Sequence, residues 1–164
     1  MTFQEFQIKV MSHVFKEIET NNFTGTLYML TGKYKRKIAP IPPEMFSDTS
    51  VIADNCKNMN KLANSIFCCF VSECNFTKLD REACTDAGID FDKIESKDLT
   101  LEEVSKIKDL TIEGLVFNFE SLNDDPKIMM FKKENENYIP SIGFKEEDDS
   151  LEQTAGTFSN LLNK

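Results

Sequence analysis

The chain has 164 residues, of which 40% are apolar and 29% charged, so it is long enough for one domain with its own hydrophobic core. Its 28 acidic and 19 basic residues give a net charge of −9, which argues against general binding to nucleic acid or to an anionic membrane surface. The acids are unevenly distributed: residues 73–125 hold 15 acids and 6 bases, whereas residues 1–72 have a small excess of bases. We therefore expect an acidic surface formed by the middle third of the chain.

The sequence also predicts a cytoplasmic location. Met1–Val10 has neither the basic cluster nor the long apolar stretch of a secretory leader. The longest apolar run, Ile66–Val71, is far too short to span a membrane. An odd number of cysteines favours reduced thiols over disulfides, and with one histidine in the chain a zinc site would need four of them. These cysteines are Cys56, Cys68, Cys69, Cys74 and Cys84.

The first half of the chain predicts two helices and three strands. Apolar residues at helical spacing indicate a helix over residues 2–19, and Ser47 or Asp48 can cap a second helix over 49–63. Strands are expected at Thr26–Leu30 and near Tyr34–Ile41. The continuous apolar run Ile66–Val71 is typical of a strand in the centre of a sheet.

The second half begins with residues 75–99, which lack periodicity and are expected to form an irregular acidic insertion of loop or short helix. Thr100–Glu103 has the pattern of a capping box, so a short helix to about Lys108 should follow, with Leu101, Val104 and Ile107 facing inward. Strands are predicted at Glu113–Glu120, Lys127–Lys132 and Tyr138–Phe144.

The charged run 145–149 is expected to connect these strands to a C-terminal helix capped by Ser150. The docking face of that helix would be Leu151, Ala155, Phe158, Leu161 and Leu162. The whole chain, 1–164, is thus predicted to be a single α+β domain, with a mixed or largely antiparallel sheet of about five strands and helices packed on it.

An acidic cluster in the insertion is the first candidate site. Its six residues could recruit a basic protein partner, or could collect Ca²⁺ or Mg²⁺. The EF-hand pattern fails, because placing Gly88 at its glycine position puts Ala83, Thr85 and Ala87 where oxygen ligands belong. No metal site is therefore assigned. The cluster comprises Asp80, Glu82, Asp86, Asp90, Asp92 and Glu95.

A basic patch with an interleaved tyrosine is the second candidate site. It could bind phosphate or a single strand, but lysines on an exposed edge strand that prevent edge-to-edge pairing are the favoured interpretation. His13, in the first helix, lacks a recognisable nucleophile or orienting partner, although a dyad with a cysteine remains formally open. The patch consists of Lys33, Lys35, Arg36 and Lys37.

Two acids, Glu73 and Glu120, end predicted neighbouring strands. Parallel strands would bring the two carboxylates together, whereas antiparallel strands would place them at opposite ends. The chain has no Gly-rich phosphate loop, no nucleophile elbow and no HExxH motif, so no catalytic residue and no cofactor are predicted.

Several short segments together resemble a known group of proteins. They are Lys61–Asn64 at a helix end, IFCCFVSE at Ile66–Glu73 and EGLVFNFES at Glu113–Ser121. Over residues 48–133 this order is similar to small uncharacterised phage and prophage proteins, although the aromatic residue that usually follows the glutamate is displaced to Phe76. The resemblance implies an α/β domain and a mobile-element origin, and it implies no activity.

These observations favour a non-catalytic protein-binding module, phage-encoded if the resemblance holds, that uses its acidic surface. Two alternatives stay open at this point. One is a small metal-dependent enzyme or metal-binding domain that uses the acids of 80–95, and the other is a nucleic-acid mimic.

Overall fold

The structure is a computed structural model of the whole chain, and it describes residues 1–77, 81–96, 98–109, 111–140 and 160–162. Its centre is a six-stranded antiparallel sheet in the order β2-β1-β3-β4-β5-β6, which confirms the predicted α+β class. The six strands overlap the six predicted segments, so the sheet is slightly larger than the stated total of about five. The strands are β1 (Thr26–Thr31), β2 (Arg36–Pro40), β3 (Ser65–Thr77), β4 (Thr111–Ser121), β5 (Lys127–Glu134) and β6 (Asn137–Pro140). The helices are α1 (Phe3–Glu19), the 3-10 helix η1 (Pro43–Ser47), α2 (Thr49–Ala63), α3 (Arg81–Asp86), α4 (Phe91–Ser96) and α5 (Leu101–Asp109).

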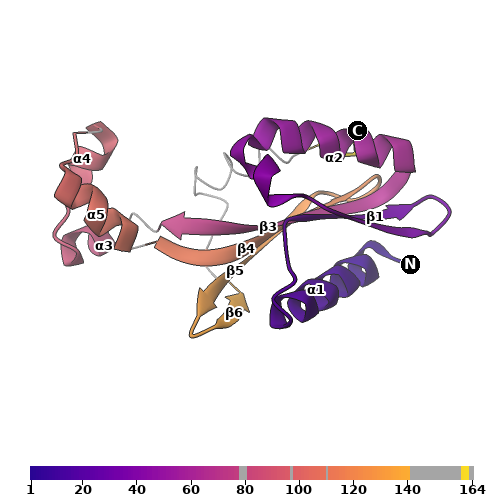
Figure 1. Cartoon of the computed structure of the whole chain (residues 1–164), viewed down its shortest axis with the longest axis horizontal. Helices are drawn as coiled ribbons and strands as arrows, with labels where there is room; N and C mark the ends of the chain where they lie inside the picture. The colour runs from indigo at the N-terminus through magenta and orange to yellow at the C-terminus, as the bar shows by residue number, and fades with distance from the viewer. Residues whose placement is uncertain (78–80, 97, 110, 141–159, 163–164) are drawn as a thin grey trace.

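The sheet carries a helix on each face, with α1 on one side and α2 on the other (Figure 1). Thr2 and Glu5 form a capping box that starts α1, and the Asp48 side chain accepts hydrogen bonds from the first amides of α2. Because both faces are covered, all of β1 and the Gly114–Ser121 part of β4 are buried.

Two hydrophobic clusters form the core, one on each face. On the α1 face, the side chains of Val14, Leu30 and Phe117 are completely buried. On the α2 face, Ile52 and Phe70 are completely buried. Cys69 belongs to the first cluster and Cys68 to the second, as expected for neighbours on a strand. None of the five cysteines, all of which are described, forms a disulfide.

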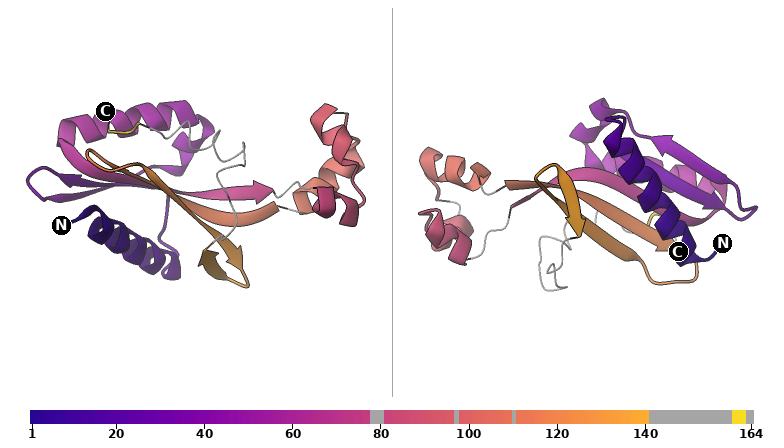
Figure 2. Two further views of the ribbon diagram at one scale, coloured as in Figure 1. Left: turned by 180° about the vertical axis from the view of Figure 1, so that it is seen from behind. Right: turned by 90° about the horizontal axis from the view of Figure 1, so that it is seen from below.

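The β3–β4 ribbon is longer than the rest of the sheet. β1 pairs with β3 only from Ser65 to Val71, whereas β4 follows β3 to Thr77. The ribbon therefore extends beyond the helices that cover the faces, and α3, α4 and α5 form a separate lobe at its tip (Figures 1 and 2). We call residues 81–109 the helical arm.

The arm agrees with one expectation and differs from another. The loop or short helix expected within residues 75–99 is present as the two short helices α3 and α4, although β3 also runs on to Thr77. The apolar positions of α5 do not all face inward, since Leu101 is 90% and Val104 is 38% exposed. In the described part of the chain no strand of the sheet lies beneath α5 (Figure 1), so Leu101 and Val104 have no sheet face to pack on.

The predicted C-terminal helix, with its connection 145–149, falls on residues 141–159, outside the described part of the chain. Leu161 is described and is completely buried against the α2-side core. Within the described residues, no helix is long and apolar enough to span a membrane.

Candidate functional site

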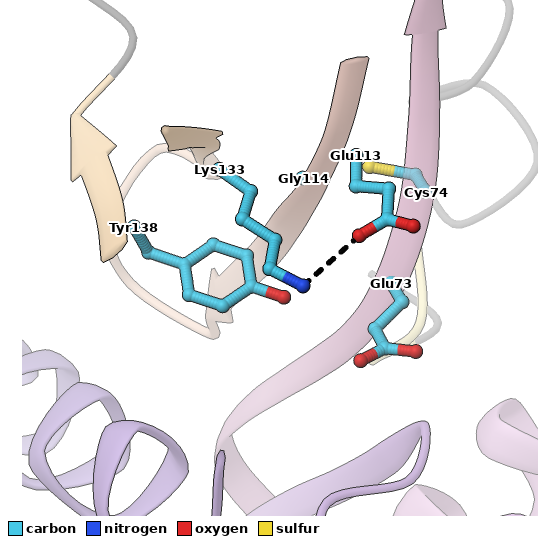
Figure 3. A pocket seen from close by; sticks show the side chains of 6 residues that line it. All are labelled: Glu73, Cys74, Glu113, Gly114, Lys133 and Tyr138. Carbon is cyan, nitrogen blue, oxygen red and sulfur yellow. Dashed lines mark hydrogen bonds and ion pairs between the residues drawn. The ribbon is translucent and has the colours of Figure 1, made fainter. Parts of the chain in front are cut away.

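A shallow pocket of about 310 Å³ lies on the β3–β6 half of the sheet, close to the base of the arm (Figure 3). We call it the strand-end pocket. Four side chains, one from each of four adjacent strands, supply its polar groups: Glu73, Glu113, Lys133 and Tyr138. Cys74 and Gly114 complete the lining.

Strand register explains why these four residues meet. Glu113 pairs with Asn75, two residues from Glu73, so the two glutamates lie diagonally on one face of the sheet. Lys133 pairs with Tyr138 on the next two strands. These polar side chains form a row across the four strands. The row lies beside the end of the area covered by α1, where the Phe15 ring centroid of α1 is 6.5 Å from that of Tyr138.

The pocket has an excess of negative charge. The Lys133 ammonium donates a hydrogen bond to Glu113 at 3.1 Å and lies 3.7 Å from the Glu136 carboxylate. The hydrogen bond to Glu113 and these two charges raise the pKa of Lys133, which keeps the lysine cationic. Glu73 is exposed, and among the described residues no cation lies within ion-pair distance of its carboxylate. Within the described part of the chain, the Glu73 carboxylate is therefore left without a positive partner.

The remaining titratable groups of the pocket are held in their neutral forms. Burial raises the pKa of the Tyr138 hydroxyl, and the Glu73 charge adds to this effect. Burial raises the pKa of the Cys74 thiol to about 12, with Glu73 again contributing. A nucleophilic cysteine or a lysine base needs a lowered pKa, which is the opposite of the shifts of Cys74 and Lys133.

Beside the pocket, the helical arm is acidic and held together by its own polar contacts. It contains nine acids and five bases. Arg81 pairs with Asp92 at 3.2 Å and stacks over the Phe91 ring at 4.7 Å, which ties α3 to α4. Lys93 pairs with Glu103 at 3.3 Å, which ties α4 to α5.

The acids predicted from the sequence therefore have different roles. Glu82 and Asp86 are exposed and form no ion pair with any described residue, which leaves them available to a partner. The Asp90 side chain accepts a hydrogen bond from the Asp92 amide at the start of α4, and the Asp92 carboxylate is paired with Arg81. Asp80 and the side chain of Glu95 lie outside what the structure describes. Where side chains are described, no three of the Asp, Glu, His and Cys residues are grouped so as to hold a metal ion.

The second acid predicted at a strand end, Glu120, lies far from the pocket. The strands are antiparallel, with Glu73 opposite Leu115 and Glu120 opposite Cys68, so the two carboxylates do not meet. Glu120 is only 4% exposed, and its oxygens accept hydrogen bonds from the amides of Leu161 and Leu162 at 2.8 and 3.0 Å. These hydrogen bonds hold Leu161 and Leu162 against the sheet.

The basic patch lies at the other end of the sheet, on the β1–β2 hairpin. Lys33, Lys35, Arg36 and Lys37 are all exposed, and β2 is an edge strand of the sheet, as the favoured interpretation required. His13 faces this hairpin from α1, with its ring 5.6 Å from that of Tyr28 and its Nδ1 4.0 Å from Glu17.

The sequence reasoning found Glu73 and missed its three companions in the pocket. Glu113 stands in phase with Leu115 and Phe117, and Lys133 stands in phase with Phe131, so each is a charged residue at a core-facing position near a strand end. This pattern could be recognised in the sequence. The pairing of the four strands, which brings these positions together, could not.

The comparisons with known proteins add no name to this site. No family model, no curated protein and no solved structure matches the chain. The similarity to phage proteins thus stays a prediction, and the argument for function depends on the geometry of the pocket and the arm.

Proposed function

We propose that this protein is a non-catalytic binding module that takes up a basic segment of another protein at the strand-end pocket, with the acidic arm assisting. One observation carries the proposal: the Glu73 carboxylate borders the pocket without a cationic partner among the described residues (Figure 3). A lysine or arginine side chain from a partner would supply that missing charge.

The other groups of the pocket suit the same ligand. The Tyr138 ring offers a face to a cation, and Glu113 offers a second carboxylate that Lys133 neutralises only in part. Arginine is the better match, because its planar fork can bind a carboxylate with two hydrogen bonds while stacking on an aromatic ring.

The arm contributes charge at longer range. Glu73 lies four residues before the end of β3, and Glu113 lies two residues after the start of β4, so the pocket and the arm are neighbours on one ribbon. Exposed acids such as Glu82 and Asp86 attract a basic segment over distances of about 8 Å at physiological salt. This attraction speeds encounter more than it tightens the final complex.

A peptide-binding measurement tests the proposal. The probe is a fluorescein-labelled peptide with one arginine among small apolar residues, and its partner probe has glutamate in place of arginine. We expect anisotropy to show binding of the arginine peptide only, and this binding should weaken between about 50 and 300 mM salt. Glu73→Gln should weaken it about fivefold, corresponding to ~1 kcal/mol for an exposed ion pair.

Glu44→Gln is the matched control, because Glu44 is an exposed acid of η1 and does not line the pocket. It changes the net charge equally and should leave the affinity unchanged. Equal binding of the two peptides, or an equal loss in the Glu73 and Glu44 variants, would show that the pocket does not recognise a cation.

A further inference from the structure

A second groove, of about 240 Å³, lies at the opposite end of the sheet, between α1 and the β1–β2 hairpin. Its lining is mainly apolar, with Phe6 and Val10 of α1 buried to 3% and 4% exposure. Ile38 of β2, which is 50% exposed, forms the open side. The volume is slightly below the roughly 300–1,000 Å³ of sites for drug-sized ligands, so a small molecule fits it better than a peptide.

Three basic side chains border this apolar floor: Lys9 of α1, and Arg36 and Lys37 of β2. Arg36 pairs with Leu30, whose side chain belongs to the core cluster on the α1 face, whereas Lys37 pairs with Met29 of the opposite cluster. Directly paired residues point to the same side of a sheet, so Arg36 lies on the face that α1 covers. The side chains of Lys9 and Arg36 are exposed, and no carboxylate of the described residues lies within ion-pair distance of either one.

Two acids lie near the groove without lining it. Glu5, one turn before Lys9, accepts a hydrogen bond from the Thr2 amide at 2.7 Å, and this contact, with a smaller contribution from the Lys9 charge, lowers its pKa. Glu17 lies beside His13, and its charge adds to the effect of burial on the pKa of Tyr28. No acid is found among the described residues that line the groove, so its charge is positive.

A hydroxyl adds one polar group to the groove. Tyr28 lines the groove, and its hydroxyl forms no hydrogen bond with any described residue, so it is available to a ligand. Burial raises the pKa of this hydroxyl, so it stays protonated and can donate a hydrogen bond.

We propose that this groove binds a small amphiphilic carboxylate, that is, an acid carrying a short alkyl or aryl group. The apolar part would cover Phe6, Val10 and Ile38, while Lys9 and Arg36 would flank the carboxylate. Inorganic phosphate fits less well, because the apolar floor offers no hydrogen bonds to replace its hydration.

The experiment is a ¹H–¹⁵N correlation titration of the full chain with octanoate, octylammonium or inorganic phosphate as probes. We expect saturable shifts from octanoate at amides of residues 9–13, 28–29 and 36–38. The double variant Lys9→Gln/Arg36→Gln should weaken octanoate binding at least tenfold, and Tyr28→Phe should weaken it about threefold. The arm should show no shifts, which separates this site from the strand-end pocket.

Lys33→Gln/Lys35→Gln is the matched control, because it removes the same charge from the same hairpin at residues that do not line the groove. It should retain the wild-type affinity. Three results would each overturn the proposal: octylammonium binding as tightly as octanoate, phosphate binding as tightly as octanoate, or an equal loss in the two double variants. Thermal unfolding of every variant shows whether a loss of binding is only a loss of folding.

Discussion

The helices on the sheet and the helices of the arm show the same sequence pattern and different outcomes. In α1 the periodic apolar residues are buried, and Val14 has no exposed surface. In α5 the periodic residue Leu101 is 90% exposed. Periodicity therefore identifies which face of a helix is apolar, but a second element must lie opposite that face before it becomes core.

The two regions also differ in what holds them together. The sheet with its two helices has a core rich in aromatic contacts, such as Phe117 on Phe119 at 5.9 Å and on Phe131 at 5.4 Å. Among its described residues the arm has a capping box at Thr100 and ion pairs such as the exposed one between Arg81 and Asp92, and an exposed ion pair contributes about 0–1 kcal/mol. The arm should therefore open before the sheet does.

The largest effect is expected in the core. Phe117→Ala removes a completely buried ring that contacts three other aromatic rings, and it should lower the free energy of unfolding by about 3–5 kcal/mol. Urea denaturation followed by circular dichroism measures this. A loss below about 1 kcal/mol would mean that the sheet face is not the core of the protein.

A smaller effect is expected at Glu120. Glu120→Ala leaves the amides of Leu161 and Leu162 without their acceptor in a buried position, which should cost about 1–3 kcal/mol. Hydrogen exchange should then speed up at these two amides and remain unchanged in the arm. Glu44→Ala, an exposed control, should change neither quantity. Unchanged exchange at Leu161 in Glu120→Ala would show that the carboxylate does not hold the chain end.

The buried thiols can be used to compare the stability of the two regions. Burial raises the pKa of Cys56 from its ordinary value of 9.0 to about 12, so the native thiol stays protonated while the unfolded thiol ionises. The unfolded state then binds fewer protons than the native state, and the free energy of unfolding should fall as pH rises from about 9 towards 12.

At pH 8, iodoacetamide should modify Cys84 of the arm before Cys56, because modification of a buried thiol requires opening. Mass spectrometry of the peptides gives the order, and the reverse order would show that the arm is the more stable region.

Much of the fold could be predicted from local patterns. The capping box at Thr100 is present, with the Thr100 amide donating to Glu103 at 2.9 Å and the Glu103 amide donating to the Thr100 hydroxyl at 3.2 Å. The central strand around Ile66–Val71 could be located because both of its faces are apolar. Each of these signals depends on residues a few positions apart in the chain.

The candidate site was less accessible to sequence reasoning, for a physical reason. Glu73 and Tyr138 are 65 positions apart, and they meet only because β3, β4, β5 and β6 pair in one register. The acidic character of the arm could be counted from the sequence. Which of its acids are already paired, as Asp92 is with Arg81, depends on how three short helices pack together.

The smallest effect on stability is expected at the exposed apolar face of α5, and it completes the comparison. Leu101→Gln replaces a side chain that is already 90% exposed, so the free energy of unfolding should change by less than about 0.5 kcal/mol. Leu115→Gln makes the same chemical change at a completely buried position of β4, and it should destabilise the protein by several-fold more. Urea denaturation of the two variants measures both values. If Leu101→Gln destabilised the protein as much as Leu115→Gln, the apolar face of α5 would be covered in solution, and the contrast between arm and sheet would be lost. If Leu101→Gln leaves the free energy of unfolding unchanged and also lowers the affinity for the arginine peptide, α5 belongs to the same binding surface as Glu73.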